Sequence, residues 1–347
     1  MKVKIIGCGS IGNHYANVYV NRGHRVYVTD KDPKAIERMV NIIYPNRYGK
    51  WDNRIKIIDS DDRRENYDLT FIGTPPASHL TEAIKILKNN NSKIIHIEKP
   101  VSLINDKNLN KFNKLRKKSK ILILNGYNLN FSKPVYKVLE LIRKNHLGKF
   151  LYLNTNVREH WEGIFKAHPW IKKKNDTYLT NIKYGGGALL EHSHALSYWM
   201  FFSYILKKGK VKKVKSDISI IKSKNIKYDN ISNLLLETDN GLKGKVSQDV
   251  ITKPEKKNVE LIYEKGKIEL INNYSKDLDL VSFYDYSNDN LKIIRFKKTR
   301  ADDFIGMVKQ HENIFKNGTI NYLSSIDFGL DVIKVIEKAF NQLNYNR

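Results

Sequence analysis

Residues 7–12 (GCGSIG) have the types and spacing of a loop that binds the phosphates of a nucleotide ligand. Gly7 permits the tight bend, Gly9 lets a pyrophosphate approach the backbone, and Gly12 lets the following helix pack closely on a sheet. A glycine turn without a ligand is the structural alternative. The elements that flank the motif decide between the two.

The flanking elements favour a bound ligand. The apolar strand Val3–Ile6 leads into the motif, and the helical pattern Ile11–Asn21 leaves it. The backbone N–H groups of Ser10 and Ile11 then face the phosphates, together with the positive end of the helix dipole. The order of strand, glycine turn and helix is typical of dinucleotide binding.

Asp30 ends the next predicted strand, Arg25–Thr29, and lies 18 residues after Gly12. An acidic residue ~20 residues beyond the glycine motif hydrogen-bonds the ribose hydroxyl of NAD. Its carboxylate repels a 2′-phosphate, so we expect NAD as the cofactor. Lys31 could offset that repulsion in part, which leaves NADP as the alternative.

Residues 73–79 (GTPPASH) follow the predicted strand Leu69–Ile72. They reach the edge of the sheet where open α/β proteins bind ligands. We expect Thr74, Pro75 and His79 to contact the cofactor there. The alternative is a plain strand-to-helix turn stiffened by proline.

Glu98-Lys99-Pro100 directly follows the predicted strand Lys93–Ile97 and reaches the same edge. The Lys99 ammonium can hydrogen-bond a substrate hydroxyl or carbonyl and stabilise a developing alkoxide. We expect Lys99 to be catalytic and to lie, with Glu98, at the cofactor. Pro100 stiffens the turn and can adopt a cis peptide bond. A purely structural lysine–proline turn is the alternative.

Three glycines, residues 185–187, introduce a predicted helical block over Gly187–Phe202. Glu191 and His194 are three residues apart and would share one face of that helix. A carboxylate that orients an imidazole makes a competent general base near neutral pH. The alternatives are an ion pair at the helix end or a metal site with His192. We expect no metal, because adjacent helical residues point apart.

Strands and helices alternate through residues 1–127, which predicts a parallel sheet covered by helices on both faces. After Phe150, strand-like runs of alternating polarity predict an antiparallel sheet with one wet face. The expected fold class is α/β: a doubly wound Rossmann domain, residues 1–127, and an α+β domain with an open antiparallel sheet, residues 128–347. A last helix, Asp327–Leu343, is expected to pack back on the first domain. The other predicted helices are Pro33–Tyr44, Ala77–Leu87, Leu109–Lys118 and Val135–Lys144, and the other strands are Ile55–Ile58, Ile121–Leu124, Phe150–Val157, Val211–Ile221, Asn233–Glu237, Leu242–Ile251, Val259–Tyr263 and Lys267–Ile271.

The composition limits the possible partners. The chain has 347 residues and a formal charge of +26. Its lysines are scattered through every segment and do not alternate with aromatic residues, so we expect a solvated surface and no nucleic-acid partner. The single cysteine, Cys8, fits a reducing compartment. No signal-peptide pattern and no apolar run of ~20 residues occur, so we expect a cytoplasmic protein without a membrane partner.

Together these motifs resemble the glucose–fructose oxidoreductase / inositol dehydrogenase (Gfo/Idh/MocA) family over essentially the whole chain. Glu98-Lys99-Pro100 is the most specific of them, and residues 126–131 (GYNLNF) and 324–330 (SSIDFGL) also match. The resemblance implies NAD(P)-dependent oxidation or reduction of a sugar, nucleotide sugar or cyclitol. It also implies a homodimer or homotetramer packed through the open sheet, whose exposed face would otherwise be an apolar liability.

The resemblance also implies roles for individual residues. Lys99 acts at the substrate hydroxyl, and His194 matches the acid/base histidine. Glu191 takes the place of an acidic substrate contact, and Asn128 matches a loop residue near the nicotinamide. A subgroup tied to surface-polysaccharide and acyl-sugar biosynthesis fits best, because it has Glu-x-Ser-His where residues 191–194 read EHSH.

That subgroup also carries His-Pro-Trp upstream, as residues 168–170 do, so we expect Trp170 to contact the substrate. Residues 172–174 (KKK) could meet an anionic substrate, although a solvated run is the favoured interpretation. The subgroup's Glu and Asp after the histidine are Ala195 and Ser197 here. This departure motivates the alternative of a non-catalytic NAD(H)-binding sensor or partner protein.

Overall fold

The computed structural model describes residues 1–59, 65–144, 146–166, 171, 173 and 177–344. The chain divides into two compact units. The first combines Met1–Tyr127 with Phe304–Leu330, and the second combines Asn128–Asp303 with Asp331–Arg347. The segment Phe304–Leu330, which the sequence analysis places in the second domain, thus belongs to the first unit.

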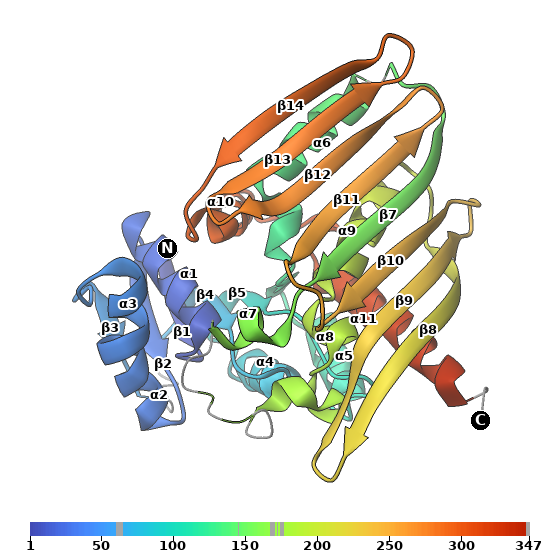
Figure 1. Ribbon diagram of the computed structural model, residues 1–347. Helices are drawn as coiled ribbons and strands as arrows, with labels where there is room; N and C mark the ends of the chain where they lie inside the picture. Colours follow the sequence, from blue (N-terminus) through green and yellow to red (C-terminus); the bar gives the residue numbers. More distant parts are fainter. Residues whose placement is uncertain (60–64, 145, 167–170, 172, 174–176, 345–347) are drawn as a thin grey trace. The chain divides into compact units, whose positions relative to one another are not determined.

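The first unit is built on a six-stranded sheet whose neighbouring strands all pair in parallel (Figure 1). The order β3-β2-β1-β4-β5-β6 is that of doubly wound dinucleotide-binding sheets. The strand order reverses between β1 and β4, because β2 and β3 lie on one side of β1 and β4, β5 and β6 lie on the other. The predicted Rossmann fold is confirmed. The strands are β1 (Lys2–Ile6), β2 (Arg25–Thr29), β3 (Ile55–Ile57), β4 (Tyr67–Ile72), β5 (Ser92–Ile97) and β6 (Leu122–Asn125).

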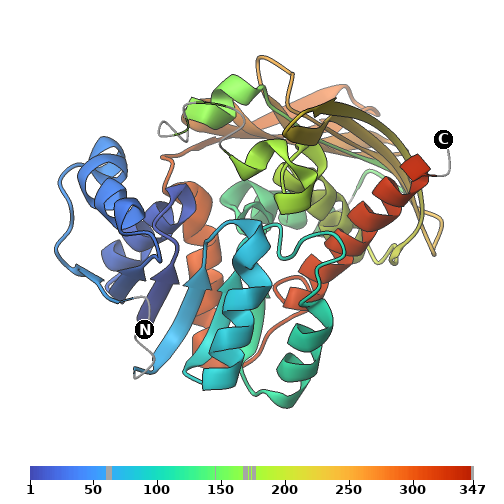
Figure 2. The same cartoon turned by 90° about the horizontal axis from the view of Figure 1, so that it is seen from below.

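Helices cover both faces of this sheet. Figure 2 shows α4 (His79–Asn89) and α10 (Asp302–Asn317) on opposite sides of the strands. The strands are apolar on both faces because each face is buried, as the adjacent residues Ile94 and Ile95 in β5 illustrate. Other helices of this unit include α1 (Ser10–Asn21), α5 (Leu109–Lys118) and the first turn of α11 (Ile326–Asn341).

The predicted helix Pro33–Tyr44 is longer and less regular than expected. α2 (Pro33–Arg38) continues through a π-helical turn (Met39–Ile43) into α3 (Tyr44–Tyr48). Pro45 lacks a backbone N–H, and the wider turn just before it lets the helix continue through the proline.

The second unit is built on an eight-stranded sheet of order β14-β13-β12-β11-β7-β10-β9-β8. The predicted antiparallel pairing holds for every neighbouring pair except β7 and β10, which run parallel, so the sheet is mixed. The strands are β7 (Phe150–Arg158), β8 (Val211–Ser223), β9 (Ile226–Thr238), β10 (Lys243–Asp249), β11 (Lys256–Tyr263), β12 (Gly266–Ser275), β13 (Leu278–Asp285) and β14 (Asn290–Lys297).

One face of the large sheet is covered and the other is open. The covered face packs against α6 (Lys133–Arg143), α8 (Ala188–Glu191) and α9 (His194–Ile205). Leu153 and Leu261 on this face are fully buried. Along the open face, Lys215, Leu235 and Lys245 stand opposite one another on three adjacent strands. Two of these three side chains are charged, which fits the predicted wet face of the sheet.

Among the α-helices and strands of the described residues, α7 (Trp161–Lys166), β13, β14 and α10 had no counterpart in the sequence analysis. The predicted helical block Gly187–Phe202 is two helices, because the chain turns at His192 and Ser193 between α8 and α9. Within the described residues, no helix has the length and apolar character needed to cross a membrane.

Candidate functional site

The glycine turn lies at the carboxyl ends of β1, β2 and β4. The Gly7 N–H donates to the Thr29 carbonyl (2.9 Å), and the Gly73 N–H donates to the Ile6 carbonyl (2.8 Å). Gly7 has φ +112°, and a Cβ there would come within 2.6 Å of the Gly73 carbonyl oxygen. Only glycine therefore fits where the turn crosses the switch point of the sheet.

The start of α1 has the features of a phosphate site. Gly9 brings no capping side chain, and the first turn holds no acidic residue. A Cβ on Gly9 would point into open space, whereas one on Gly12 would lie 2.0 Å from the Gly7 carbonyl oxygen. The backbone N–H groups of Ser10 and Ile11 lie in this first turn, where helical N–H groups have no partner within the helix. The residues present fit a dinucleotide pyrophosphate.

Asp30 lies directly beside the glycine turn. Its Oδ2 accepts a hydrogen bond from the Cys8 N–H (2.8 Å), and its Oδ1 accepts one from the Asp32 N–H (3.0 Å). Two backbone donors thus fix the carboxylate where β2 ends. Burial raises the pKa of the Cys8 thiol, and the Asp30 charge raises it further, so this cysteine is an inert thiol at neutral pH.

Arg47 joins the site from α3, and sequence reasoning missed it. Its guanidinium donates to the Ser10 carbonyl (3.0 Å) and to the Ser10 hydroxyl (2.9 Å). The contact fixes the first residue of α1 and brings a permanent positive charge to the phosphate-binding turn. No local pattern in the sequence marks Arg47, because it lies 37 residues from its partner.

The Thr74 loop and the Glu98-Lys99-Pro100 turn are joined by His79. This buried ring places Nε2 2.8 Å from the Thr74 carbonyl oxygen and Nδ1 2.9 Å from the Pro100 carbonyl oxygen. Burial lowers the pKa of His79, while the two carbonyl acceptors oppose that shift. Both ring nitrogens of His79 thus face backbone carbonyls of the two loops that the side chain connects. Pro75 is exposed beside Thr74.

Lys99 lies just beyond the carboxyl end of β5, and the Lys99–Pro100 peptide bond is cis. The buried Glu98 carboxylate accepts a hydrogen bond from the Lys99 backbone N–H (3.1 Å). A Cβ on Gly126 would come within 2.6 Å of the Glu98 Cα, so the loop after β6 packs tightly on this turn. The first unit thus collects the glycine turn, Asp30 and the Lys99 turn at one edge of its sheet.

In the second unit, each glycine of the 185–187 run meets a separate requirement. Gly185 and Gly187 have φ +95° and +92°, which favours glycine. A Cβ on Gly186 would lie 2.3 Å from the Tyr178 carbonyl oxygen. A Cβ on Gly187 would lie 2.0 Å from Asp229 Oδ1. The run is therefore a tightly packed entry into α8.

Asp229 on β9 holds the N-terminus of α8. Its Oδ2 accepts hydrogen bonds from the Leu189 N–H (2.7 Å) and the Ser232 hydroxyl (2.6 Å). Burial raises the pKa of Asp229 to about 6, although both hydrogen bonds lower it in part. Gln248 supports the same turn, because its side-chain amide donates to the Ala188 carbonyl (3.0 Å).

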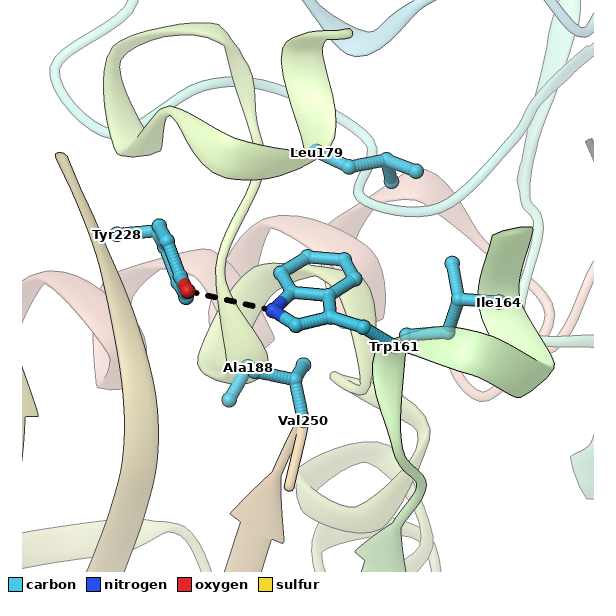
Figure 3. Packing of buried hydrophobic residues seen from close by; sticks show 6 residues of the cluster. All are labelled: Trp161, Ile164, Leu179, Ala188, Tyr228 and Val250. Carbon is cyan, nitrogen blue, oxygen red and sulfur yellow. Dashed lines mark hydrogen bonds between the residues drawn. The ribbon is translucent and has the colours of Figure 1, made fainter. Parts of the chain in front are cut away.

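An aromatic cluster supports α8 from the other side. Figure 3 shows Trp161 packed among apolar side chains, with its indole N–H donating to the Tyr228 hydroxyl (3.4 Å). Trp161 is buried and comes from α7, which the sequence analysis did not find. The other buried members are Ile164, Leu179, Ala188 and Val250.

Glu191 and His194 lie on two different helices, whereas the sequence analysis expected them on one. Glu191 ends α8 and His194 begins α9, so the two side chains do not share a face of one continuous helix. Both are half-buried. Asn128, buried in the second unit, donates its side-chain amide to the Asp303 carbonyl (2.7 Å). Trp170 lies outside the described residues.

A cavity of about 590 Å³ opens at the amino ends of β4, β5 and β6, lined among others by Tyr67, Ser92 and Leu122. This is the edge of the six-stranded sheet opposite the glycine turn. Ligands of such sheets bind at the carboxyl edge, so this cavity is separate from the candidate site.

Solved structures with the same fold cover the whole chain. An oxidoreductase from Agrobacterium radiobacter, in complex with NAD+, L-tartaric acid and magnesium, has 17% identity and a TM-score of 0.75, over 100% of this chain and 97% of that one. Aldose–aldose oxidoreductase from Caulobacter crescentus has 15% identity and a TM-score of 0.78, over 100% and 98%. The WlbA dehydrogenase from Bordetella pertussis, in complex with NADH and UDP-GlcNAcA, has 14% identity and a TM-score of 0.70, over 100% and 97%.

Two family models match the chain in tandem. Residues 1–126 match the oxidoreductase family with an NAD-binding Rossmann fold, and residues 135–269 match the GFO/IDH/MocA C-terminal domain. No curated protein has a significantly similar sequence. The family matches agree with the strand order of the first unit and with the glycine turn at its switch point. The chain belongs to the Gfo/Idh/MocA family of NAD(P)-dependent oxidoreductases.

Proposed function

We propose that this protein transfers hydride between NAD(H) and a CH–OH or carbonyl carbon of a sugar, nucleotide sugar or cyclitol, in surface-glycan or sugar metabolism. The observation that carries the proposal is the grouping of the glycine turn, Asp30 and the Lys99 turn at the carboxyl edge of the first unit's sheet. Such an edge is where a dinucleotide and its reacting partner meet.

The charged side chains and the backbone N–H donors at the glycine turn support binding of the cofactor. The start of α1 supplies N–H groups to the pyrophosphate, and Arg47 adds a positive charge at Ser10. Asp30 accepts from the adenosine ribose and disfavours a 2′-phosphate, which supports NAD over NADP. Thr74 and Pro75 would contact the cofactor next to the nicotinamide. Glu98 would lie at the cofactor as well, where its carboxylate holds the Lys99 backbone N–H.

The bound dinucleotide would supply hydride exchange at its nicotinamide ring. In the proposed mechanism, the Lys99 ammonium donates a hydrogen bond to the substrate oxygen and stabilises its developing negative charge. His194 takes the hydroxyl proton during oxidation and returns it during reduction. Glu191, Asn128 and Trp170 would bind and orient the substrate.

A nucleotide-linked or acidic sugar is the substrate class that we favour. The similar Bordetella pertussis structure holds NADH and UDP-GlcNAcA, and the Glu-x-Ser-His pattern of residues 191–194 fits the subgroup that modifies such sugars. The excess of lysine and arginine over acidic residues favours an anionic substrate over a cationic one.

The departure that motivated a non-catalytic protein has a structural counterpart. Ala195 and Ser197 are both fully buried in α9, and the Ser197 hydroxyl donates to the His194 carbonyl (3.1 Å). In this chain the side chains at these two positions therefore pack α9 against its surroundings. We retain catalysis as the proposed function, in a cytoplasmic homodimer or homotetramer.

The first experiment measures NAD+ reduction against a panel of nucleotide sugars, free sugars and cyclitols, with Lys99→Ala and His194→Ala as variants. Each variant should lower kcat by about 100-fold or more, because each removes a group acting on the substrate oxygen. The Kd for NAD+ should stay nearly unchanged. Lys107→Ala, at an exposed lysine of the same unit, is the control.

Equal turnover by wild type and both variants would refute the catalytic assignment. Tight NAD+ binding without turnover on the whole panel would favour the sensor.

A further inference from the structure

A buried chain of hydrogen bonds in the first unit leads from α1 to the Glu98 carboxylate, and the proposed reaction does not use it. The Tyr19 hydroxyl lies 2.5 Å from His311 Nδ1. His311 Nε2 lies 2.9 Å from His96 Nδ1, and His96 Nε2 lies 3.4 Å from Glu98 Oε1. The two imidazoles and the phenol are fully buried, and Glu98 is only 6% exposed. These hydrogen bonds thus join α1, α10 and β5 in a region that is closed to solvent.

The chemistry of the end group fixes the direction of every bond. A neutral histidine has one ring nitrogen that donates and one that accepts. The Glu98 carboxylate can only accept, so His96 carries its proton on Nε2 and accepts at Nδ1. His311 must then donate from Nε2 and accept at Nδ1, which leaves the Tyr19 hydroxyl as the terminal donor. With Glu98 ionised, this arrangement satisfies every polar atom of the hydrogen-bonded series, whereas a protonated Glu98 would donate to His96 and reverse every bond.

The surroundings keep both imidazoles neutral. The His96 ring stacks on the Phe71 ring, with 4.6 Å between the centroids, and lies near Tyr15, so aromatic rings pack beside it. Burial, together with a smaller contribution from the neighbouring His79, lowers the pKa of His96 to about 3. Burial also lowers the pKa of His311, and the approach of His96 adds to that shift.

Charged groups stand at both ends of the chain. At the far end, Glu312 on α10 pairs with Arg22 (2.6 Å) and with His24 (2.8 Å). Burial raises the pKa of Tyr19, and the Glu312 charge adds to it, so the phenol keeps its proton. At the near end, the Tyr15 phenol faces Glu98, whose charge adds to burial in raising the pKa of Tyr15. Lys99 and His79 complete the groups around the carboxylate.

We propose that Tyr19, His311 and His96 form a directional relay that holds Glu98 as a carboxylate and thereby positions Lys99. The carboxylate is the acceptor for the Lys99 backbone N–H, so its orientation sets where the lysine leaves β5. His96 and His311 are positioning residues, since they act through Glu98. The inference rests on the proposed catalytic role of Lys99.

A structural test is independent of any substrate. Long-range proton–nitrogen NMR of ¹⁵N-histidine protein, assigned with His96→Gln and His311→Gln, reports which ring nitrogen carries the proton. Both rings should be neutral Nε2–H tautomers from about pH 6 to about pH 8, well above any pKa that burial has lowered. In Glu98→Gln the acceptor-only end is lost, and the two rings should populate mixed tautomers. A cationic ring, or an Nδ1–H tautomer in the wild type, would overturn the relay.

A kinetic test then asks whether the relay positions Lys99. His311→Phe breaks the chain, whereas His311→Gln restores it, since the amide oxygen can accept from Tyr19 and the amide nitrogen can donate to His96. His311→Phe should lower kcat by about tenfold or more through misplacement of Lys99, and should move the acid limb of the kcat profile to higher pH. The Kd for NAD+ should not change, and His311→Gln should recover both kcat and the pH profile.

Tyr19→Phe is the milder variant if His311→Phe does not fold, and it should shift kcat in the same direction. Tyr44→Phe is the matched control, because it removes another buried hydroxyl of this unit, one bonded to Asn17 (3.1 Å). Wild-type kcat and pH profile in both His311→Phe and Tyr19→Phe would refute the positioning role. Absence of turnover in the wild type would refute the proposed function instead, while the NMR result would still decide the relay.

Discussion

In the proposed function, Asp30 is the residue on which the choice between NAD and NADP depends most directly. Its two carboxylate oxygens accept hydrogen bonds from the Cys8 and Asp32 backbone N–H groups, which hold the side chain at the end of β2. A fixed carboxylate at the end of β2 hydrogen-bonds two ribose hydroxyls and repels a phosphate at the same place.

Replacing Asp30 by Ala should therefore weaken NAD+ binding more than NADP+ binding. Loss of hydrogen bonds to a charged acceptor costs about 1.5–3 kcal/mol, which corresponds to a rise in the Kd for NAD+ of about 10- to 100-fold. Titration calorimetry with both dinucleotides measures the two Kd values. Asp106→Ala, at another acidic residue of the first unit, serves as the control.

An unchanged Kd for NAD+ in Asp30→Ala would contradict the ribose contact. Equal weakening of NAD+ and NADP+ would contradict its role in selectivity.

Residues of the site were predictable where their pattern is local. The glycine turn, Asp30 and Glu98-Lys99 are read from short runs that follow apolar strands. Arg47, Asp229 and the paired imidazoles His96 and His311 were not predictable, because each acts on a partner 37 to 215 residues away. Spacing along the chain carries no signal for such contacts.

At the scale of elements, α8 is held at its N-terminus by a buried acidic residue. Asp229 has a pKa raised to about 6 from 3.8, chiefly by burial, so the folded state favours its neutral form. Its contribution to stability is then largest below about pH 4 and is lost as the pH rises through about 6.

Asp229→Asn should accordingly flatten the pH dependence of stability. The amide keeps an acceptor for the Leu189 N–H and carries no charge to bury. Between pH 4 and 7 the wild type should lose stability relative to this variant by about 3 kcal/mol, the value of a shift of roughly two pKa units. Urea unfolding at several pH values measures the difference.

Asp217→Asn, at an exposed position on β8, should leave the pH dependence unchanged. Parallel stability curves for wild type and Asp229→Asn would show that folding does not raise the pKa of Asp229, contrary to this account.

Elements were predictable where the hydrophobic period is clear. The strands of the first sheet occur where expected, because buried parallel strands are continuous apolar runs. Helix α5 also occurs where expected. β14 was missed because an exposed edge strand rich in lysine lacks a buried face. α10 does carry buried Phe304, Met307 and His311 at helical spacing, so its period was readable. The break between α8 and α9 had no local signal.

At the scale of the whole molecule, the proposed oligomer would pack through the open face of the eight-stranded sheet. Leu235 is 52% exposed between Lys215 and Lys245, and Glu260 and Glu269 lie on the same face farther along the sheet. A face with both charge signs around an apolar residue can associate with a second copy, and that association should weaken with salt.

Sedimentation velocity should therefore find a dimer or tetramer at about 0.1 M salt and a smaller species near 1 M, where charges are screened within a few ångströms. Leu235→Lys should favour the smaller species, because it puts a third ammonium beside Lys215 and Lys245. Ile42→Lys, at an exposed apolar residue of the first unit, is the control. A wild-type monomer at every concentration and salt would contradict the proposed oligomer.

The central claim is that Lys99 and His194 act on one substrate at one nicotinamide ring. A crystal structure of the protein with NAD+ bound tests it most directly. The account predicts the pyrophosphate on the start of α1, the ribose hydroxyls on Asp30, and the nicotinamide C4 within about 5 Å of both the Lys99 ammonium and the His194 ring, close enough for a substrate carbon and oxygen to fit between them. A nicotinamide ring far from either side chain, or a dinucleotide bound away from the glycine turn, would contradict it.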